Sequence, residues 1–165
     1  MKPIITKITH LDARYPMRLL ECPERPDELR LSGVSSPEDI LNRPMVAIVG
    51  TRDCSPYGRE CVMKLVKQLS LLPERPTVVS GLALGIDVAA HLAALEHGLP
   101  TIAVLPTGLD TIYPYAHRDI AARIATAPLS ALVTEFPDGT MPVAFNFLRR
   151  NRIIAGLACS TVVVE

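Results

Sequence analysis

The hydrophobic pattern of the chain changes at Met45. Beyond this residue, short apolar runs alternate with longer segments whose apolar residues recur at helical spacing. The short runs predict five strands, at Val46–Val49, Thr77–Ser80, Thr101–Leu105, Ala131–Thr134 and Thr161–Glu165. The segments between them predict helices at about Gly58–Leu72, Ile86–His97, Arg118–Ala125 and Arg149–Ala158.

This alternation predicts an α/β fold. Strands and helices that follow one another strictly favour right-handed crossovers, and therefore a doubly wound, mostly parallel sheet of about five strands. In the first predicted helix, Cys61, Leu65, Leu69 and Leu72 share one face, with Val62 and Val66 beside it, which is helical spacing. In such sheets a ligand binds beyond the carboxyl ends of the strands, where the strand order reverses.

Residues 1–45 show no comparable regularity. Six prolines interrupt this part of the chain, and we expect an irregular N-terminal arm with one short helix near Pro37–Leu41. Residues 46–165 then form the regular domain.

Composition narrows the function classes. The chain has 165 residues, of which 48% are apolar and 4% aromatic, and its 17 basic and 17 acidic residues cancel. Without net charge no global field attracts nucleic acid, so binding of a polyanion needs a local cluster. The four cysteines lack metal-ligand spacing, and no apolar run approaches the length of a membrane span. We expect a cytoplasmic protein with reduced thiols and no membrane association.

Two glycine-containing turns follow the first two predicted strands. Backbone N–H groups at such strand-to-helix turns are suited to binding a phosphate. Arg52 in the first turn adds a cation that can grip phosphate with two hydrogen bonds, although it could instead pair with Asp53. The candidate residues in the two turns are Gly50, Thr51, Arg52, Ser80, Gly81 and Gly85.

The densest positive cluster is Phe147–Arg152, which contains Arg149, Arg150 and Arg152. Arginines beside an aromatic residue fit a surface that binds the phosphates and bases of single-stranded nucleic acid. The alternative is a solvated helix end. Because we place these cations at a helix N-terminus, where they oppose the helix dipole, the pattern favours an anionic partner.

The other titratable residues indicate structural roles. Asp87 and His91 are four residues apart on one predicted helix; we favour a helix cap for Asp87 and a local hydrogen-bond partner for His91 over an acid–base pair. Glu135 ends the fourth strand, facing the same crevice, as an anchor or a base, and Arg118 lies near the Gly108 loop. No catalytic triad, phosphate loop or dinucleotide fingerprint occurs. We expect no catalysis, no cofactor and no metal.

Taken in order, these motifs resemble the DNA-processing protein A family (DprA, also called Smf). The resemblance covers about residues 46–165, and the joint order of the motifs is highly specific. It rests on Val49–Arg52, Ser80–Asp87 with Ala90-His91, Thr101–Leu105, Gly108–Asp110 with Tyr113-Pro114, Glu135–Pro142, and Phe147 with Arg150–Leu157. Departures from the family pattern are Thr51 in place of serine, Leu148 in place of proline and His117 in place of asparagine.

The resemblance implies a Rossmann-like domain that binds single-stranded DNA in a basic pocket. It also implies loading of a RecA-type recombinase during natural transformation and DNA recombination, with no catalysis. The pocket residues carried over are Gly50, Thr51, Arg52, Ser80, Gly81, Gly85, Phe147, Arg150, Asn151 and Arg152, and we add Arg118 and Arg149 as neighbouring cations.

The family's domain continues past the strand that ends at Glu165, and its homodimer is associated with that later half. We therefore expect this chain to be mainly monomeric. Two other hypotheses stay open: a nucleotide-binding or nucleotide-hydrolysing enzyme, although the Pro-Gly-Gly-x-Gly-Thr stretch of one such class is absent, and a paralogue that acts only through protein contacts.

Overall fold

Seven strands form one sheet, in the order β1-β2-β6-β5-β4-β3-β7, in the computed structural model of residues 1–165. Five of them run parallel: β3 (Met45–Gly50), β4 (Thr77–Ser80), β5 (Thr101–Val104), β6 (Ala131–Thr134) and β7 (Ser160–Val164). These are the five strands predicted from the sequence, each within one residue of its expected bounds. The doubly wound α/β fold class is therefore confirmed.

The expectation of an irregular N-terminal arm is wrong. Residues before Met45 form β1 (Ile4–Thr9), α1 (Met17–Leu20), β2 (Glu28–Gly33) and α2 (Pro37–Leu41). Strand β1 pairs antiparallel with β2, and β2 pairs antiparallel with β6, so both strands extend the sheet. The short helix at Pro37–Leu41 is the part of the expectation that is confirmed.

The prolines of this segment mark the ends of elements and do not interrupt them. Pro3 precedes β1, Pro26 lies before β2, and Pro37 opens α2, where its missing N–H costs no hydrogen bond. Inside β2 the buried side chains of Leu29 and Leu31 alternate with polar residues. This period-two pattern was the available sequence signal for the missed strand.

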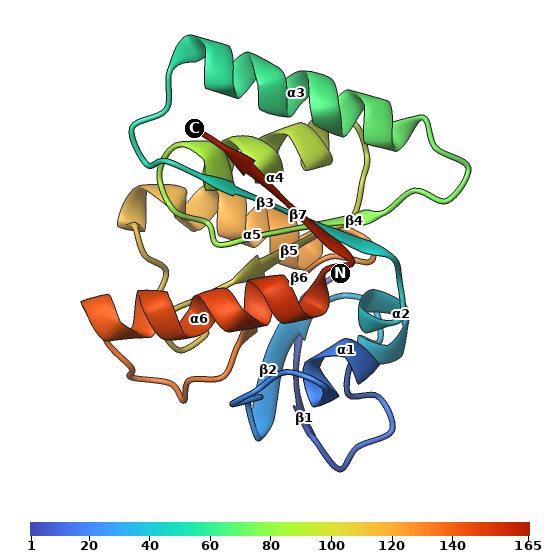
Figure 1. Cartoon of the computed structure of the whole chain (residues 1–165). Coiled ribbons are helices and arrows are strands. Elements are labelled where there is room, and N and C mark those ends of the chain that lie inside the picture. The colour runs from blue at the N-terminus through green and yellow to red at the C-terminus, as the bar shows by residue number, and fades with distance from the viewer.

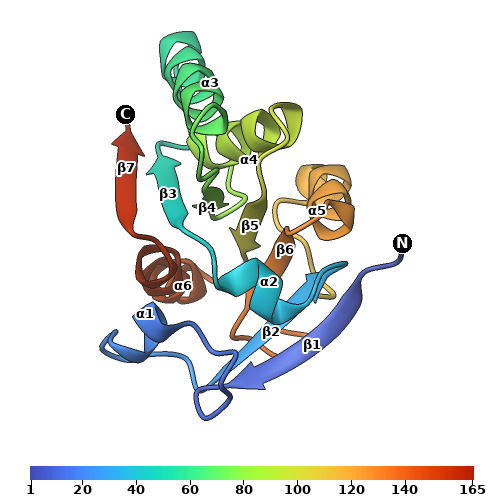
Figure 2. The same cartoon turned by 90° about the vertical axis from the view of Figure 1, so that its right-hand side faces the viewer.

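Helices cover both faces of the sheet (Figure 2). One face carries α3 (Pro56–Ser70), α4 (Ile86–Glu96) and α5 (Arg118–Thr126), and a short 3₁₀ turn at Tyr115–His117 precedes α5. The opposite face carries α6 (Ala144–Leu157), against which α1 packs. None of the helices is both long and apolar enough to span a lipid bilayer.

Two helix predictions need correction. Helix α6 begins at Ala144, five residues before the expected start, so Phe147 and the arginines lie inside it. In α3 the fully buried side chains are Val62 and Val66, while Leu72 lies beyond the helix and is 48% exposed. The reason is that α3 packs mainly on α4 and on the edge strand β7. As a result, a narrower stripe of the α3 surface faces the core.

The central strands are buried on both faces, which explains their uninterrupted apolar runs. Toward α6 the core contains Val79, Val104 and Ile154, and toward α4 it contains Ile48 and Val78. The small side chains of α4 allow this helix to lie close to the strands; the buried ones are Ala90, Ala93 and Ala94.

The strand order reverses beside β3. The chain leaves β3 through α3 toward β4 on one side, and returns through α6 on the opposite face to place β7 on the other side (Figure 1). The carboxyl ends of β3 and β7 therefore border the reversal point at which ligands bind in doubly wound folds.

Candidate functional site

A cavity of about 570 Å³ lies at this reversal point. Its walls are the carboxyl ends of β3 and β7 and one face of α6. Polar side chains in the lining are Thr51, Arg52, Asp87, Arg150, Asn151, Thr161 and Glu165. Of the residues predicted from the sequence, the lining contains Gly50, Thr51, Arg52, Phe147, Arg150 and Asn151.

The loop after β3 presents Arg52 to solvent beside the cavity. Its guanidinium carbon lies 5.2 Å from the centroid of the Phe147 ring, an arrangement typical of a cation–π contact. No carboxylate lies within ion-pairing distance, so the alternative pairing with Asp53 does not occur. Arg52 therefore keeps its donors and its charge available to a ligand.

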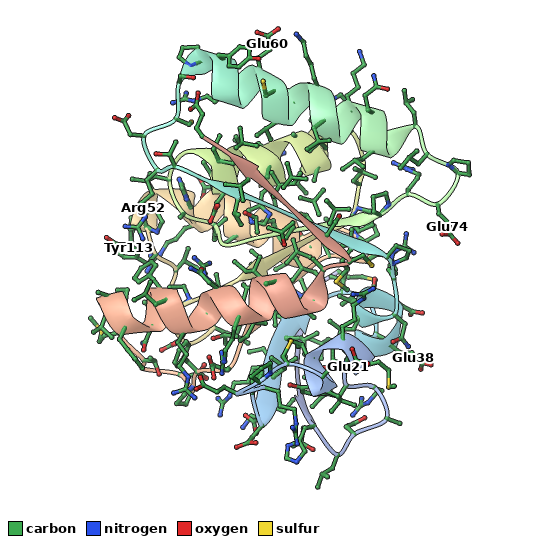
Figure 3. All side chains as sticks on the ribbon, in the orientation of Figure 1. Glu21, Glu38, Arg52, Glu60, Glu74 and Tyr113 are labelled. Carbon is green, nitrogen blue, oxygen red and sulfur yellow. The ribbon has the colours of Figure 1, made fainter.

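Aromatic side chains extend the site away from the cavity. The Tyr113 ring meets the Phe147 ring edge to face, with centroids 5.6 Å apart. Arg52 and Tyr113 lie next to each other near the start of α6 (Figure 3). Together with Ala144 and Leu148 they border a second hollow of about 420 Å³. A cation beside a pair of aromatic rings is suited to a ligand that carries both phosphate and flat bases.

The second glycine turn is used internally. The Asp87 carboxylate lies beside the backbone of Gly81 and Ala83, which favours its charged form, and the N–H of Ile86 donates to the Thr51 carbonyl at 3.1 Å. Ser80 is buried and donates its hydroxyl to the Ile48 carbonyl at 2.6 Å. The Ser80 hydroxyl and the Ile86 N–H thus already have acceptors within the protein.

Gly85 serves the contact between the two turns. Its φ is +77°, and a Cβ there would lie 2.2 Å from the Thr51 carbonyl oxygen. Only glycine allows both this backbone conformation and this approach. The turn therefore shapes the wall of the site without contributing a side chain to it.

The arginines of α6 do not converge. Arg150 points inward, is 4% exposed and lines the cavity. Arg152 donates two hydrogen bonds of 2.7 Å to the carboxylate of Glu135 and a third to the Glu24 carbonyl. Arg149 lies 3.4 Å from the same carboxylate. Glu135 therefore neutralises this pair outside the cavity and does not face the crevice as expected.

The dipole argument made from the sequence also fails. Because α6 begins at Ala144, the three arginines occupy its sixth, seventh and ninth positions, not its first turn. The helix dipole acts on charges near the helix ends, so it gives no reason for an anionic partner here.

Arg118 stands apart from the cavity. Its guanidinium carbon lies 4.0 Å from the centroid of the Tyr115 ring at the start of α5, and it lines neither hollow. A role for Arg118 in binding stays a prediction.

His91 has a structural role, as predicted, but with a different partner. Its Nδ1 lies 2.7 Å from the Thr101 hydroxyl, and complete burial lowers the pKa of His91 to about 3. The imidazole is therefore neutral at physiological pH. Asp87 is the second residue of α4 and provides no side-chain cap, since the N-cap is Gly85.

Comparison with known proteins identifies this arrangement. A family model described as DNA recombination-mediator protein A matches residues 6–165. The chain belongs to this family. It is 43% identical over 155 residues to the DNA processing protein DprA of Streptococcus pneumoniae, an alignment that covers 94% of this chain and 52% of that protein. It is 41% identical over 159 residues to Protein Smf of Synechocystis, an alignment that covers 96% of this chain and 39% of that protein.

Solved DprA structures share the fold. The X-ray structure of the S. pneumoniae protein superposes with a TM-score of 0.90 at 40% identity, over 98% of this chain and 54% of that one. The DprA structure of Helicobacter pylori, which concerns the single-stranded DNA binding mode of that protein, superposes with a TM-score of 0.82 at 28% identity. This alignment covers 99% of this chain and 71% of the H. pylori chain. The chain spans about half or less of the length of these two curated relatives.

Two carboxylates of this DprA-family site were not singled out from the sequence as cavity residues. Burial raises the pKa of Asp87, an effect that the nearby Arg150 guanidinium opposes. Glu165 accepts hydrogen bonds from the backbone N–H and the hydroxyl of Ser55, and this lowers its pKa. The signal for Glu165 was its place at the end of β7, beside the first glycine turn. No cluster of metal-ligating side chains occurs in the molecule.

Proposed function

We propose that this chain binds single-stranded DNA at the cavity between β3, β7 and α6. The observation that carries the proposal is the exposed Arg52 guanidinium over Phe147, with no carboxylate to neutralise it. Membership of the DprA family supports it, since the H. pylori relative is described by its single-stranded DNA binding mode.

The contacts follow from what each side chain offers. Arg52 holds a phosphate. The Thr51 hydroxyl and the Asn151 amide at the cavity wall form hydrogen bonds with the same DNA strand. Phe147 and Tyr113 stack against bases, which single strands expose and duplexes cover. Binding therefore favours single strands over duplex DNA.

We propose binding and not catalysis. Of the two carboxylates at the cavity, Asp87 is buried and Glu165 accepts hydrogen bonds from Ser55. Neither is presented as a free base toward a ligand. Family membership also supports a role beside a RecA-type recombinase in DNA processing, which we propose for the protein as a whole.

Titration of the chain with labelled oligo-dT and with a duplex of equal length, each at two salt concentrations, tests the proposal. We expect oligo-dT to bind more tightly, with log K falling by about 0.7 per neutralised phosphate for each unit of log salt. Tighter binding of a mononucleotide than of oligo-dT, or a flat salt dependence, would instead support the nucleotide-enzyme hypothesis. Adding a RecA-type recombinase to the preformed complex then tests whether it assembles faster on the bound strand.

A further inference from the structure

We propose that Arg150 is a positioning residue, which clamps the N-terminal half of α6 to the carboxyl ends of β4 and β5 and does not itself contact the strand. This inference rests on the proposed function, because the side chains that it positions, Phe147 and Asn151, are those assigned to the DNA. It departs from the sequence prediction, in which Arg150 binds the nucleic acid directly.

The contacts of Arg150 are those of an internal tie. Its Nη1 donates to the Gly81 carbonyl at 2.6 Å and to the Val104 carbonyl at 2.5 Å. Val104 is the last residue of β5, and Gly81 follows the last residue of β4. To reach a phosphate, the guanidinium would have to leave both carbonyls, and both would then be buried without a donor.

Gly81 provides the seat for this side chain. A Cβ at Gly81 would lie 2.0 Å from Nη1 of Arg150 and 2.4 Å from its guanidinium carbon. Such a contact is impossible unless the guanidinium moves. The absence of a side chain at Gly81 therefore has a specific purpose, which is to admit Arg150.

The first half of α6 has few other attachments. Its N-cap residue, Val143, makes no side-chain hydrogen bond, and the buried apolar residues of the helix all lie at Ile153 or later. Before them, the buried residues are Asn146 and Arg150, and Asn146 bonds to the Met141 carbonyl of the preceding loop. Arg150 is thus the buried tie between this half-helix and the sheet, which α6 otherwise flanks in Figure 1.

The charge of Arg150 is partly offset inside the protein, because the Asp87 carboxylate favours the charged guanidinium. Asp87 is the buried carboxylate beside it, although the two make no direct ion pair. A cation compensated in this way contributes less to counterion release from DNA than an exposed one such as Arg52.

The salt dependence of binding separates positioning from phosphate contact. We expect Arg150→Ala to weaken oligo-dT binding about tenfold while leaving the slope of log K against log salt unchanged. Arg52→Ala, the matched control, lowers the slope by about 0.7. The proposal would be overturned if Arg150→Ala lowered the slope of log K against log salt as much as Arg52→Ala does. It would also be overturned if folded Arg150→Ala bound oligo-dT with unchanged affinity.

Gly81→Ala tests the same tie with all charges kept, and it also serves if Arg150→Ala does not fold. Its Cβ displaces the guanidinium, so we expect weaker binding at an unchanged salt slope. In the Arg150→Ala variant there is no guanidinium to clash with, so adding Gly81→Ala should cause no further loss of affinity for oligo-dT. Full additivity of the two changes contradicts the clamp.

Amide hydrogen exchange keeps this inference distinguishable from the proposed function, because it needs no DNA. In free protein we expect residues 144–151 to exchange faster in Arg150→Ala and in Gly81→Ala than in wild type or Arg52→Ala. Unchanged exchange refutes the clamp whether or not the protein binds DNA. Failure of the wild type to bind oligo-dT refutes the proposed function and leaves the exchange result standing.

Discussion

The arginines that lie at two different faces of α6, Arg52 from the loop after β3 and the helix's own Arg149 and Arg152, differ in what neutralises them. Arg52, on the side of Phe147 and Asn151, is exposed and has no carboxylate within reach. Arg149 and Arg152, on the other side, share the carboxylate of Glu135, whose side chain is only 7% exposed. Three arginines that look alike in the sequence therefore have different roles. Arg52 is available to bind a ligand, whereas Arg149 and Arg152 pair with a carboxylate of the protein.

The comparison teaches that local partners, not the number of cations, determine where a neutral protein attracts an anion. The chain has equal numbers of acidic and basic residues, so a positive region exists only where a carboxylate is missing. Each face of α6 therefore makes a separate prediction: variants on the Arg52 face change binding, and variants on the Glu135 face change stability.

The largest expected effect is that of Arg52→Ala on binding. Losing a charge-assisted contact to phosphate should cost about 2 kcal/mol, or roughly 30-fold in affinity for oligo-dT. Because Arg52 is exposed and makes no ion pair, the free energy of unfolding should stay within about 0.5 kcal/mol of wild type. Fluorescence anisotropy and urea denaturation measure the two quantities.

Arg118→Ala is the matched control for Arg52→Ala, since it removes another exposed arginine stacked on an aromatic ring. We expect a smaller loss of affinity than for Arg52→Ala, because Arg118 lines neither hollow. A loss equal to that of Arg52→Ala would extend the binding surface to the start of α5. An Arg52→Ala variant that is folded and binds normally would remove Arg52 from the site.

The next effect is that of Arg152→Ala, which should act on stability. The change removes both hydrogen bonds to Glu135 and the one to the Glu24 carbonyl, and leaves a nearly buried carboxylate with Arg149 alone. We expect a loss of about 2 kcal/mol in the free energy of unfolding. The salt slope of oligo-dT binding, measured on the folded variant, should not change. A flatter slope with normal stability would place Arg152 on the DNA.

The sequence predicted the parallel part of the fold well, because strands buried on both faces are uninterrupted apolar runs. It failed for β1 and β2, whose surroundings are rich in proline and whose apolar residues alternate with polar ones. The start of α6 was also missed, since Val143 offers no capping side chain to mark it. This one error moved the arginines to the wrong part of the helix.

The site could be predicted only in part. Arg52 and Phe147 were assigned to one surface, and the structure brings them into contact. The partners of the other arginines were not readable, because Glu135 lies 17 residues before Arg152 and meets it only through the fold. Likewise, sequence spacing does not show that the Ser80 hydroxyl donates to the Ile48 carbonyl of the neighbouring strand.

A smaller effect is expected for Phe147→Ala. Base stacking on an aromatic ring contributes about 1–3 kcal/mol per base, and we expect the lower end because Tyr113 remains. The salt slope should be unchanged, since no charge is lost. Phe145→Ala is the control: it removes an exposed ring from the same helix, 67% exposed and outside both hollows. Equal losses in the two variants would show that α6 as a whole, and not the Phe147 site, carries the stacking.

The smallest effect is a gain of affinity for Glu135→Gln. The amide cannot neutralise Arg149 and Arg152, so the face of α6 that now serves the fold should become partly available to phosphate. We expect oligo-dT to bind about threefold more tightly, with a slightly steeper salt slope. Glu28→Gln removes an equal charge from the Glu28–Arg30 pair on β2, a pair that makes no contact with Arg149 or Arg152. If both variants gain equally, the effect comes from net charge, and the two faces of α6 differ less than their geometry indicates. If only Glu135→Gln gains, this carboxylate limits the site to a single face.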